Sequence, residues 1–265
     1  MQSRLPSPQV SIIVPCFNAA ATLARALNSC LAQREAAQII VVDDGSDDAS
    51  MNIAQSIALT DRRVELIRTP ENGGAARARN LGAKHATQPL LAFLDSDDEY
   101  LPGGLRGAVE ALRAAPERHV VRLNVAFVDY PPDIVAFSGF VHHAEIMNDM
   151  VTSSLVMRRT TFEALGGFPE DDVYRRYGGE DGTLQSAIMV LFGYLRMVGN
   201  KNVRNHYHAG SHVALYLRRM MGELDSPAEA VQQLGNAVEC FVARARDAWQ
   251  AHINETSRTA PGQRD

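Results

Sequence analysis

The sequence predicts an α/β protein with a mostly parallel central sheet that helices cover on both faces. Up to residue 100, short apolar runs rich in β-branched residues alternate with segments of helical periodicity. The connections are short, and the runs are apolar throughout instead of alternating with polar residues. Strands of that kind are typical of a parallel sheet buried between two layers of helices.

The first part of the chain divides into regular strand and helix segments. The predicted strands are 10–16, 38–42, 64–68 and 89–94, and the predicted helices are 19–32, 48–59 and 75–86. Acidic clusters at 43–44 and 95–98 follow the second and the fourth strand. Because ligands of open parallel sheets bind beyond the carboxyl ends of the strands, these clusters are the first candidates for a functional site.

The second part of the chain is less regular. We expect strands at 119–128, 134–141, 151–157 and 195–198, and helices from near Pro102 and at 159–165, 181–192, 213–224 and 227–250. A polar tail at 254–265 is expected to be disordered. No internal repeat or linker appears, so we expect one domain over 1–225, with halves at about 9–100 and 101–212 for two different ligands. A helical extension and the tail make up 226–265.

Composition favours an ordinary globular protein of 265 residues, 46% hydrophobic and 22% charged. The net charge of −5 gives no basic excess for binding nucleic acid or an anionic membrane surface. An anionic ligand would therefore need a metal ion or a few well-placed donors.

The cysteines and the apolar runs bear on localisation. Cys16, Cys30 and Cys240 are odd in number and lack metal-site spacing, so we expect buried free thiols in a reducing cytoplasm. The N-terminus lacks the apolar run of a signal peptide, and no apolar stretch reaches the ~18 residues of a transmembrane helix. The prediction is a cytoplasmic protein without a transmembrane segment.

The acidic cluster after the fourth strand suggests a metal site. Asp95, Asp97 and Asp98 lie within four positions, and Asp95 and Asp97 share a side-chain direction if the backbone is extended. Carboxylate oxygens are the ligands that Mg²⁺ and Mn²⁺ prefer, and such an ion would bridge two phosphates. The alternative is a solvated acidic turn that caps the next helix.

Five segments, taken in order, resemble the signatures of family 2 glycosyltransferases. They are SIIVPCFN at 11–18, IVVDDGS at 40–46, NGG at 72–74 with ARNLG at 78–82, FLDSDD at 93–98, and GGF at 166–168 with Glu180-Asp181. The resemblance covers about residues 9–212. It implies a GT-A fold, a single Rossmann-like domain, here with added C-terminal helices. It also implies inverting transfer of a sugar from a nucleoside diphosphate to an acceptor hydroxyl.

The resemblance assigns the first half to the donor. Donor-binding residues would be Pro15, Phe17, Asp43, Asp44, Arg79, Asp95 and Ser96. Asp43 or Asp44 would accept the N3–H of uracil, which favours a UDP-sugar; the alternative is that the pair caps the next helix. Arg79 would contact the base or the diphosphate, or else form a salt bridge on the helix surface.

The resemblance also assigns a metal site for Mn²⁺ or Mg²⁺. Asp95 and Asp97 would bind the ion, and Asp97 is the better candidate for direct contact. His208 would complete the shell or contact the diphosphate. His206 and His212 are neighbours that would be able to take its place.

The proton acceptor would lie in the second half. Asp181 matches the general base of the family, and Glu180 would orient the acceptor. The alternative is that both acids only complement the dipole of a helix N-terminus. The sequence GTLQSA at 182–187, on the acceptor side, departs from the family pattern.

Two other functions stay open. A sugar-phosphate nucleotidyltransferase would need a glycine-rich basic loop, and residues 15–18 hold no glycine or lysine. A non-catalytic nucleotide-sugar-binding protein would keep the fold without turnover. For the enzyme, the acceptor would be a glycan, a lipid carrier, a peptide or a small molecule. The C-terminal helices carry enough apolar residues to pack on the domain or to form a homodimer.

Overall fold

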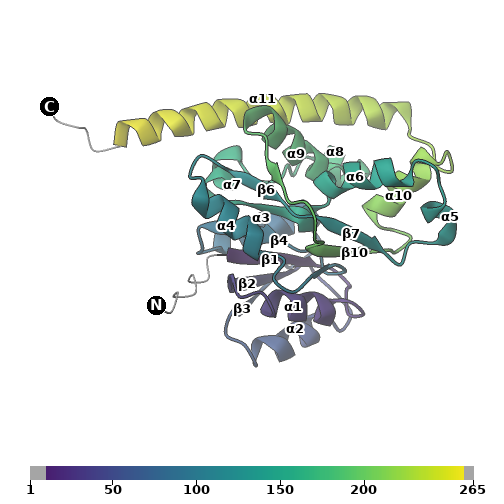
Figure 1. Cartoon of the computed structure of the whole chain (residues 1–265), viewed down its shortest axis with the longest axis horizontal. Coiled ribbons are helices and arrows are strands. Elements are labelled where there is room, and N and C mark those ends of the chain that lie inside the picture. The colour runs from purple at the N-terminus through teal and green to yellow at the C-terminus, as the bar shows by residue number, and fades with distance from the viewer. Residues whose placement is uncertain (1–9, 260–265) are drawn as a thin grey trace.

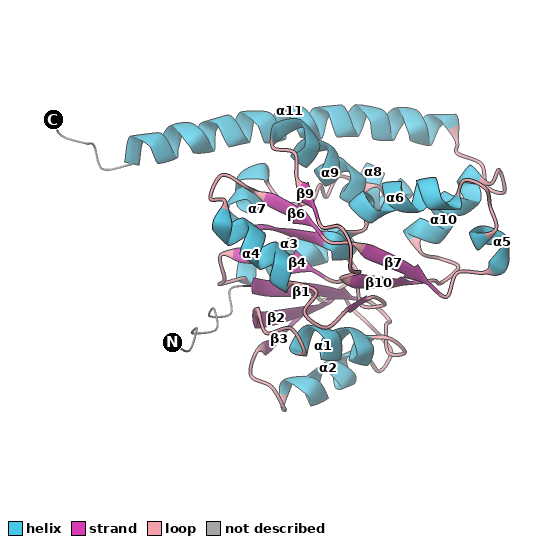
Figure 2. Ribbon diagram, viewed as in Figure 1, coloured by secondary structure: helices cyan, strands magenta, loops and turns pink. Residues whose placement is uncertain are grey.

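A seven-stranded sheet forms the centre of the molecule (Figures 1 and 2). The computed structural model describes residues 10–259. The strands, in sheet order, are β3 (Val64–Arg68), β2 (Ala36–Asp43), β1 (Val10–Cys16), β4 (Leu90–Phe93), β8 (Leu155–Arg158), β6 (Val120–Arg122) and β9 (Leu195–Arg196). Only β8 runs antiparallel to its neighbours. The predicted α/β class with a mostly parallel sheet is confirmed.

Helices cover both faces of this sheet, as predicted. One face packs against α1 (Leu23–Leu31), α2 (Ser50–Ala58) and α4 (Arg106–Ala114), and the other against α3 (Ala75–His85), α7 (Arg159–Leu165) and α9 (Glu180–Leu191). Ile12 points into the first layer and Ile13 into the second, and both are fully buried. A strand buried on both faces needs apolar residues at every position, which explains the continuous run VSIIV.

A second, smaller sheet was not predicted. It consists of β5 (Glu99–Tyr100), β10 (Val203–His206) and β7 (Val125–Val128), with β10 in the middle. The predicted strand 119–128 is therefore two strands in two sheets. The break falls at Asn124, whose side chain donates to the carbonyl oxygen of Gly199 at 3.0 Å.

The predicted strand at 134–141 is wrong. This segment belongs to α5 (Pro132–Val135) and α6 (Phe140–Met150). Pro132 occupies the first turn of α5, where proline favours a helix because its fixed φ suits the turn and its missing N–H is not needed. The predicted strand at 151–157 begins instead as a short 3₁₀ turn, η1 (Thr152–Ser154), before β8. Two helices complete this region, α8 (Asp172–Tyr177) and α10 (His212–Met220).

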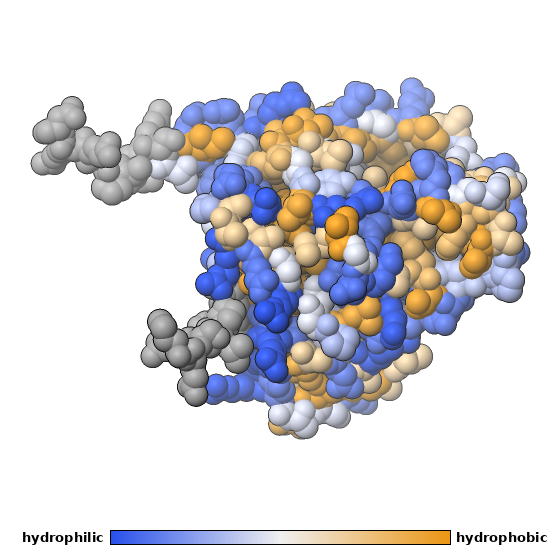
Figure 3. All heavy atoms as spheres, viewed as in Figure 1, coloured by the Kyte–Doolittle hydropathy of each residue, from blue (hydrophilic) through white to orange (hydrophobic). Residues whose placement is uncertain are grey.

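The last helix, α11 (Ala228–Thr259), lies across α7, α8 and α9 (Figure 1). Its buried stripe includes Phe241 and Ala245, and its Trp249 ring packs against His119 and Phe192. Figure 3 shows hydrophilic and apolar residues interspersed along its outer side. The disordered tail predicted from 254 is wrong as far as Thr259, because a helix fixed by packing extends at little cost per residue. Residues 260–265 lie outside the described part.

Two further predictions have outcomes here. Cys16 and Cys30 are free and buried, as expected, but Cys240 is exposed on α11, because it points away from the stripe that packs on the domain. Within residues 10–259, every helix is too short or too polar to cross a membrane.

Candidate active site

The predicted donor segments meet at one edge of the main sheet. The carboxyl ends of β1, β2 and β4 lie side by side, because β1 pairs in parallel with both of the others. Backbone bonds continue this pairing into the loops: Asp44 N donates to Cys16 O at 2.7 Å, and Leu94 N donates to Ile13 O at 3.0 Å. Both acidic clusters therefore reach the same edge, as the sequence predicts.

Asp43 and Asp44 are both buried, but their contacts differ. Asp44 accepts hydrogen bonds from Thr69 Oγ1 at 2.9 Å, Gly73 N at 2.9 Å and Gly74 N at 2.7 Å. Its carboxylate thus fixes the loop that leads into α3. Asp43 Oδ1 accepts from Ser46 N, while Asp43 Oδ2 lies 3.4 Å from Arg68 Nε and has no hydrogen-bond donor among the described residues. Neither caps α2, which begins after Ala49 without a side-chain cap.

Arg79 joins the two halves of the chain. Its guanidinium contacts Asp95 Oδ1 at 2.7 Å, Asp181 Oδ1 at 2.9 Å and Glu180 Oε1 at 3.4 Å. Its side chain is 5% exposed, so it is not the surface salt bridge of the alternative. Burial lowers the pKa of Arg79, but Asp181, Asp95 and Glu180 outweigh that effect and raise it overall. One buried cation therefore holds three carboxylates from two distant segments.

Asp181 and Glu180 occupy the first turn of α9, after the left-handed Gly179 at φ +97°. Such a φ favours glycine, and it turns the chain so that both acids reach Arg79. Burial raises the pKa of Asp181 to about 6; Glu180 and Asp95 add to this shift, and Arg79 opposes it. A carboxylate with this pKa is mostly ionised at neutral pH and remains a competent proton acceptor.

The three carboxylates of the turn at 95–98 differ in burial and in contacts. Asp98 is fully buried and accepts hydrogen bonds from Ser153 Oγ at 2.6 Å and Asn205 Nδ2 at 3.0 Å. Burial, Asp97 and Asp95 raise its pKa well above the usual range. Asp98 therefore anchors the turn to η1 and β10. Asp95 and Asp97 stay partly exposed on the outer side of the turn.

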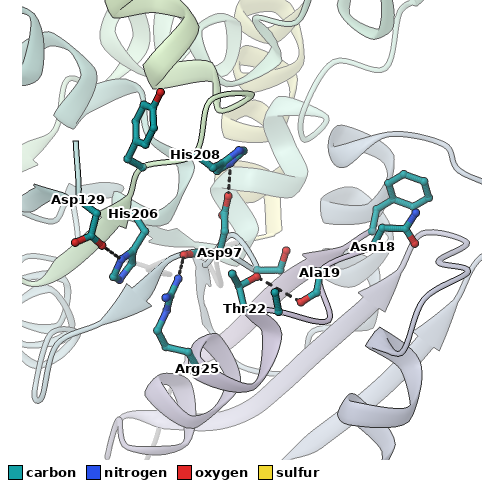
Figure 4. Close-up of a pocket in the computed structure, with 12 residues that line it drawn as sticks. Asn18, Ala19, Thr22, Arg25, Asp97, Asp129, His206 and His208 are labelled. Carbon is teal, nitrogen blue, oxygen red and sulfur yellow. Dashed lines mark hydrogen bonds and ion pairs between the residues drawn. The ribbon is translucent and has the colours of Figure 1, made fainter. Parts of the chain in front are cut away.

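A cavity of about 390 Å³ opens beside Asp97 (Figure 4). Four predicted site residues line it: Phe17, Ser96, Asp97 and His208. Its lining does not include the other predicted residues, Pro15, Asp43, Asp44, Arg79, Asp95, Glu180 and Asp181. Asn18 and Asp129, the two non-glycine residues at positive φ in the described chain, also line it. Backbone strain of this kind is concentrated at functional sites.

Among the three candidate histidines, His208 is the one that meets Asp97. Its Nε2 lies 2.7 Å from Asp97 Oδ2, and a dashed line marks this contact in Figure 4. His206 instead lies between Asp129 Oδ2 at 2.8 Å and Glu99 Oε1 at 3.3 Å. Burial and Asp95 raise the pKa of Asp97, while His208 lowers it.

The side chains around Asp97 suit a divalent ion that the protein coordinates only in part, with the substrate phosphates supplying the other ligands. The described residues hold no group of three metal-ligating side chains. They do present a carboxylate and an imidazole that face the same cavity, with Asp95 two residues from Asp97. Mg²⁺ and Mn²⁺ are often bound by one or two carboxylates together with water and substrate phosphates. Asp97 and His208 suit that mode of binding.

Asn80, the neighbour of Arg79, fixes the loop after α7. Its side chain donates to Phe168 O at 2.8 Å and Glu170 Oε1 at 2.7 Å, and accepts from Phe168 N at 2.8 Å. The Phe168 ring in turn packs against the Arg79 guanidinium, 5.3 Å from the ring centroid. The GGF signature thus supports the arginine that holds Asp181.

We expect Asn80→Ala to destabilise the protein by about 2 kcal/mol, because it leaves the buried N–H and C=O of Phe168 without partners. Urea unfolding monitored by circular dichroism measures the change. The control is Asn52→Ala on the exposed side of α2, expected within ~0.5 kcal/mol of the wild type. Equal stabilities of the two variants would contradict the role of Asn80 in fixing the loop after α7.

Comparison with known proteins connects this geometry to a family. The family model described as Glycosyl transferase family 2 matches residues 11–142. The succinoglycan biosynthesis protein ExoU of Rhizobium meliloti is 35% identical over 167 residues, which are 63% of this chain and 44% of ExoU. The chain belongs to glycosyltransferase family 2. It spans less than half the length of the curated relatives it matches.

Solved structures agree with the GT-A fold expected for a family 2 glycosyltransferase. S. aureus TarS 1–349, crystallised with UDP-GlcNAc, superposes with a TM-score of 0.61 at 17% identity, over 96% of this chain and 76% of TarS 1–349. The mannosyltransferase PcManGT from Pyrobaculum calidifontis, in complex with GDP-Man and Mn²⁺, gives 0.59 at 21%, over 93% and 75%. At these identities the likeness concerns the fold alone.

The match to the family 2 model ends at residue 142, before Asp181. The role of the segment around Asp181 therefore rests on the contacts that it makes in this structure. Residues 182–187, which depart from the family pattern, lie on α9. There Gln185 Oε1 accepts from Nε of Arg122 at 3.0 Å, and Arg122 also donates to Val151 O at 3.1 Å. Arg122 is fully buried, and burial lowers its pKa to about 10. It ties α9 to the loop before β8.

Several residues of the site are not predicted from the sequence. Asn80, Arg122, Ser153 and Asn205 act through contacts between segments far apart in the chain. For Asn80 a signal exists, because it lies inside the ARN segment of the resemblance. For the other three, the sequence offers no local pattern.

Proposed function

We propose that the protein is an inverting glycosyltransferase that moves a sugar from a UDP-sugar to an acceptor hydroxyl, with Asp181 as the general base. The observation that supports this most is the buried contact of Arg79 with both Asp95 and Asp181. It brings the acidic turn after β4 and the proton acceptor on α9 to one guanidinium, although 86 positions separate them in the sequence, from 95 to 181.

The proposed reaction needs one base. Asp181 takes the proton of the acceptor hydroxyl while that oxygen forms a bond to the anomeric carbon. The bond from this carbon to the phosphate oxygen breaks on the opposite face, so the configuration inverts. The transition state is oxocarbenium-like, as in glycoside hydrolysis. A diphosphate leaves without a protonating acid when its charge is neutralised, and a bound Mn²⁺ or Mg²⁺ would supply that neutralisation.

Each remaining site residue then has a proposed task. Asp97 and His208, with Asp95 nearby, would hold the ion. Arg79 keeps Asp95 and Asp181 at fixed positions, and Glu180 would orient the acceptor. Phe17 and Ser96 line the donor cavity, and Pro15 belongs to β1, the strand that leads into Phe17.

The donor base is proposed to meet the acidic pair after β2. Asp43 Oδ2 is the buried acceptor without a donor, and a uracil N3–H would satisfy it. Asp44 already accepts from Thr69, Gly73 and Gly74. The structural neighbours in complex with UDP-GlcNAc and with GDP-Man make UDP and GDP the first nucleotides to test.

A titration separates the three candidate functions. The protein is titrated with UDP and with GDP in the presence of Mn²⁺, and sugar release from UDP-sugars is followed in parallel. Metal-dependent UDP binding with slow sugar release is expected for the transferase. Binding without any release or transfer would favour a binding protein. Formation of a nucleotide sugar and pyrophosphate from a nucleoside triphosphate and a sugar 1-phosphate would favour a nucleotidyltransferase.

Asp97→Asn is expected to remove metal-dependent donor binding, because it replaces the carboxylate that meets His208 in the cavity. Calorimetry with UDP in the presence of Mn²⁺ and of EDTA measures the effect. Glu99→Gln is a nearby control outside the proposed metal site. Near-normal Mn²⁺-dependent affinity in Asp97→Asn would contradict the site.

The acceptor classes, the cytoplasmic location and the domain limits stay predictions. So does the homodimer through the C-terminal helices. The buried stripe of α11 is used within the chain, whereas Val231 and Ile253 remain exposed on it.

A further inference from the structure

Arg25 is a cation in the cavity that the proposed function does not yet use. It lies on α1, and its guanidinium points toward the turn at 95–98 in Figure 4. One terminal nitrogen donates to the backbone oxygen of Asp97. The side chain lines the same cavity as Asp97 and His208.

The charge of Arg25 has no counter-ion among the residues that the structure describes. Among residues 10–259, no carboxylate oxygen lies within 4.0 Å of its nitrogens, and its buried Nε has no hydrogen-bond partner. Arg79, by contrast, contacts three carboxylates, among them that of Asp95 in the same turn as Asp97. A carbonyl oxygen satisfies one N–H but does not neutralise a guanidinium. An arginine that lines a cavity in this state is suited to bind an anion from solution.

The expected charges in the cavity point to the kind of anion. A nucleoside diphosphate brings about two to three negative charges to this cavity, and Asp97 adds one. A single divalent ion leaves that sum negative, and a guanidinium beside Asp97 reduces the excess. Arginine also matches phosphate geometry, because its N–H groups bind two oxygens at once.

We propose that Arg25 binds the diphosphate of the donor and is a determinant of affinity for diphosphate over monophosphate nucleotides. This rests on the proposed function, since it takes the cavity beside Asp97 as the donor site. The bond to Asp97 O places the guanidinium next to the predicted metal ligand, where the phosphates would lie. Arg25 is a binding residue in this scheme, while Arg79 positions the base.

The test compares two substitutions. Arg25→Gln removes the charge and keeps an N–H donor for Asp97 O, and Arg25→Lys keeps a charge. Calorimetry with Mg²⁺ measures the affinities of UDP, UMP and uridine for both variants and the wild type. Thermal unfolding checks that the variants are folded. Arg106→Gln is the control, since Arg106 is exposed and pairs with Glu110 on the surface of α4.

We expect Arg25→Gln to weaken UDP binding by ~10- to 100-fold, the range of a lost hydrogen bond to a charged group. UMP binding falls less, uridine binding stays the same, and Arg25→Lys recovers part of the UDP affinity. An equal loss for all three ligands would show that Arg25 only holds the turn at 95–98. An unchanged UDP affinity would also overturn the proposal. Either of these two results overturns the role of Arg25 alone and leaves the proposed function unaffected, provided that the wild type binds UDP. A wild type that binds neither UDP nor GDP overturns the role of Arg25 and the proposed function together.

Discussion

An Asp181→Asn variant is expected to bind a UDP-sugar as tightly as the wild type and to transfer the sugar at least ~10²-fold more slowly. The substitution keeps the size of the side chain and its contact with Arg79 through an amide oxygen, but removes the proton acceptor. Donor binding depends on groups beyond Arg79 and should persist. Calorimetry and product formation measure the two quantities separately. Turnover equal to that of the wild type would remove Asp181 from the mechanism.

The pH dependence gives a second, independent signature of the same carboxylate. Because burial raises the pKa of Asp181 to about 6, the wild-type rate should increase as the pH passes through 6 and level off above it. Below that pH the carboxyl is protonated and cannot accept the hydroxyl proton. The residual rate of Asp181→Asn should lack this limb. If the rate of the variant rose in the same way near pH 6, the titrating group would be a residue other than Asp181.

Asp181 also links pH to stability, with a sign opposite to that of most surface carboxylates. Its pKa in the folded state lies above the ordinary value of 3.8, so the folded state binds more protons between these two values. Its contribution to stability is therefore lost as the pH rises through about 6. The free energy of unfolding of Asp181→Asn, measured relative to that of the wild type, should therefore be higher at pH 8 than at pH 4. Urea unfolding at both values measures the difference, and a relative loss at pH 8 would contradict this sign.

The donor half of the fold follows from local patterns, because each strand is buried on both faces and must be apolar throughout. The strand 64–68 is observed with the predicted bounds. The acceptor half does not follow in this way. Its strands are short, and residues 120–128 serve two sheets, so the pattern of a single strand is misleading. The segment 134–141 has strand-forming residues, but two helices are favoured there by Pro132 and by packing in the cluster that contains Ile134 and Met147.

The site shows the same division between local and distant information. The turn at 95–98 is predicted from its residue types, but the sequence does not distinguish the roles of its three carboxylates. Burial separates them, since Asp98 is bonded to Ser153 and Asn205 while Asp97 faces the cavity. His208 and His206 also look alike, and only the position of β10 decides that His208 meets Asp97.

Arg79→Met is expected to have the largest effect on the protein as a whole. It removes the only cation that contacts Asp95, Glu180 and Asp181 in the described structure, and leaves three carboxylates close together without a partner. Removal of one partner from a buried ion pair costs ~3–5 kcal/mol. Transfer should fall by at least ~10³-fold, because both the base and the turn at 95–98 lose their fixed positions.

The cost of Arg79→Met should depend on pH in a defined direction. Arg79 opposes the rise in the pKa of Asp181, so this pKa rises further without the cation, and the three neighbouring carboxylates repel one another when they are ionised. The loss of stability should therefore be larger at pH 8 than at pH 5. Arg79→Lys keeps a charge but cannot contact all three acids at once. Its stability should therefore lie between that of the wild type and that of Arg79→Met. Urea unfolding at both pH values tests this, with Arg106→Met as the exposed control. A loss that is the same at both pH values would mean that Arg79 contributes packing on Phe168 and little electrostatic stabilisation.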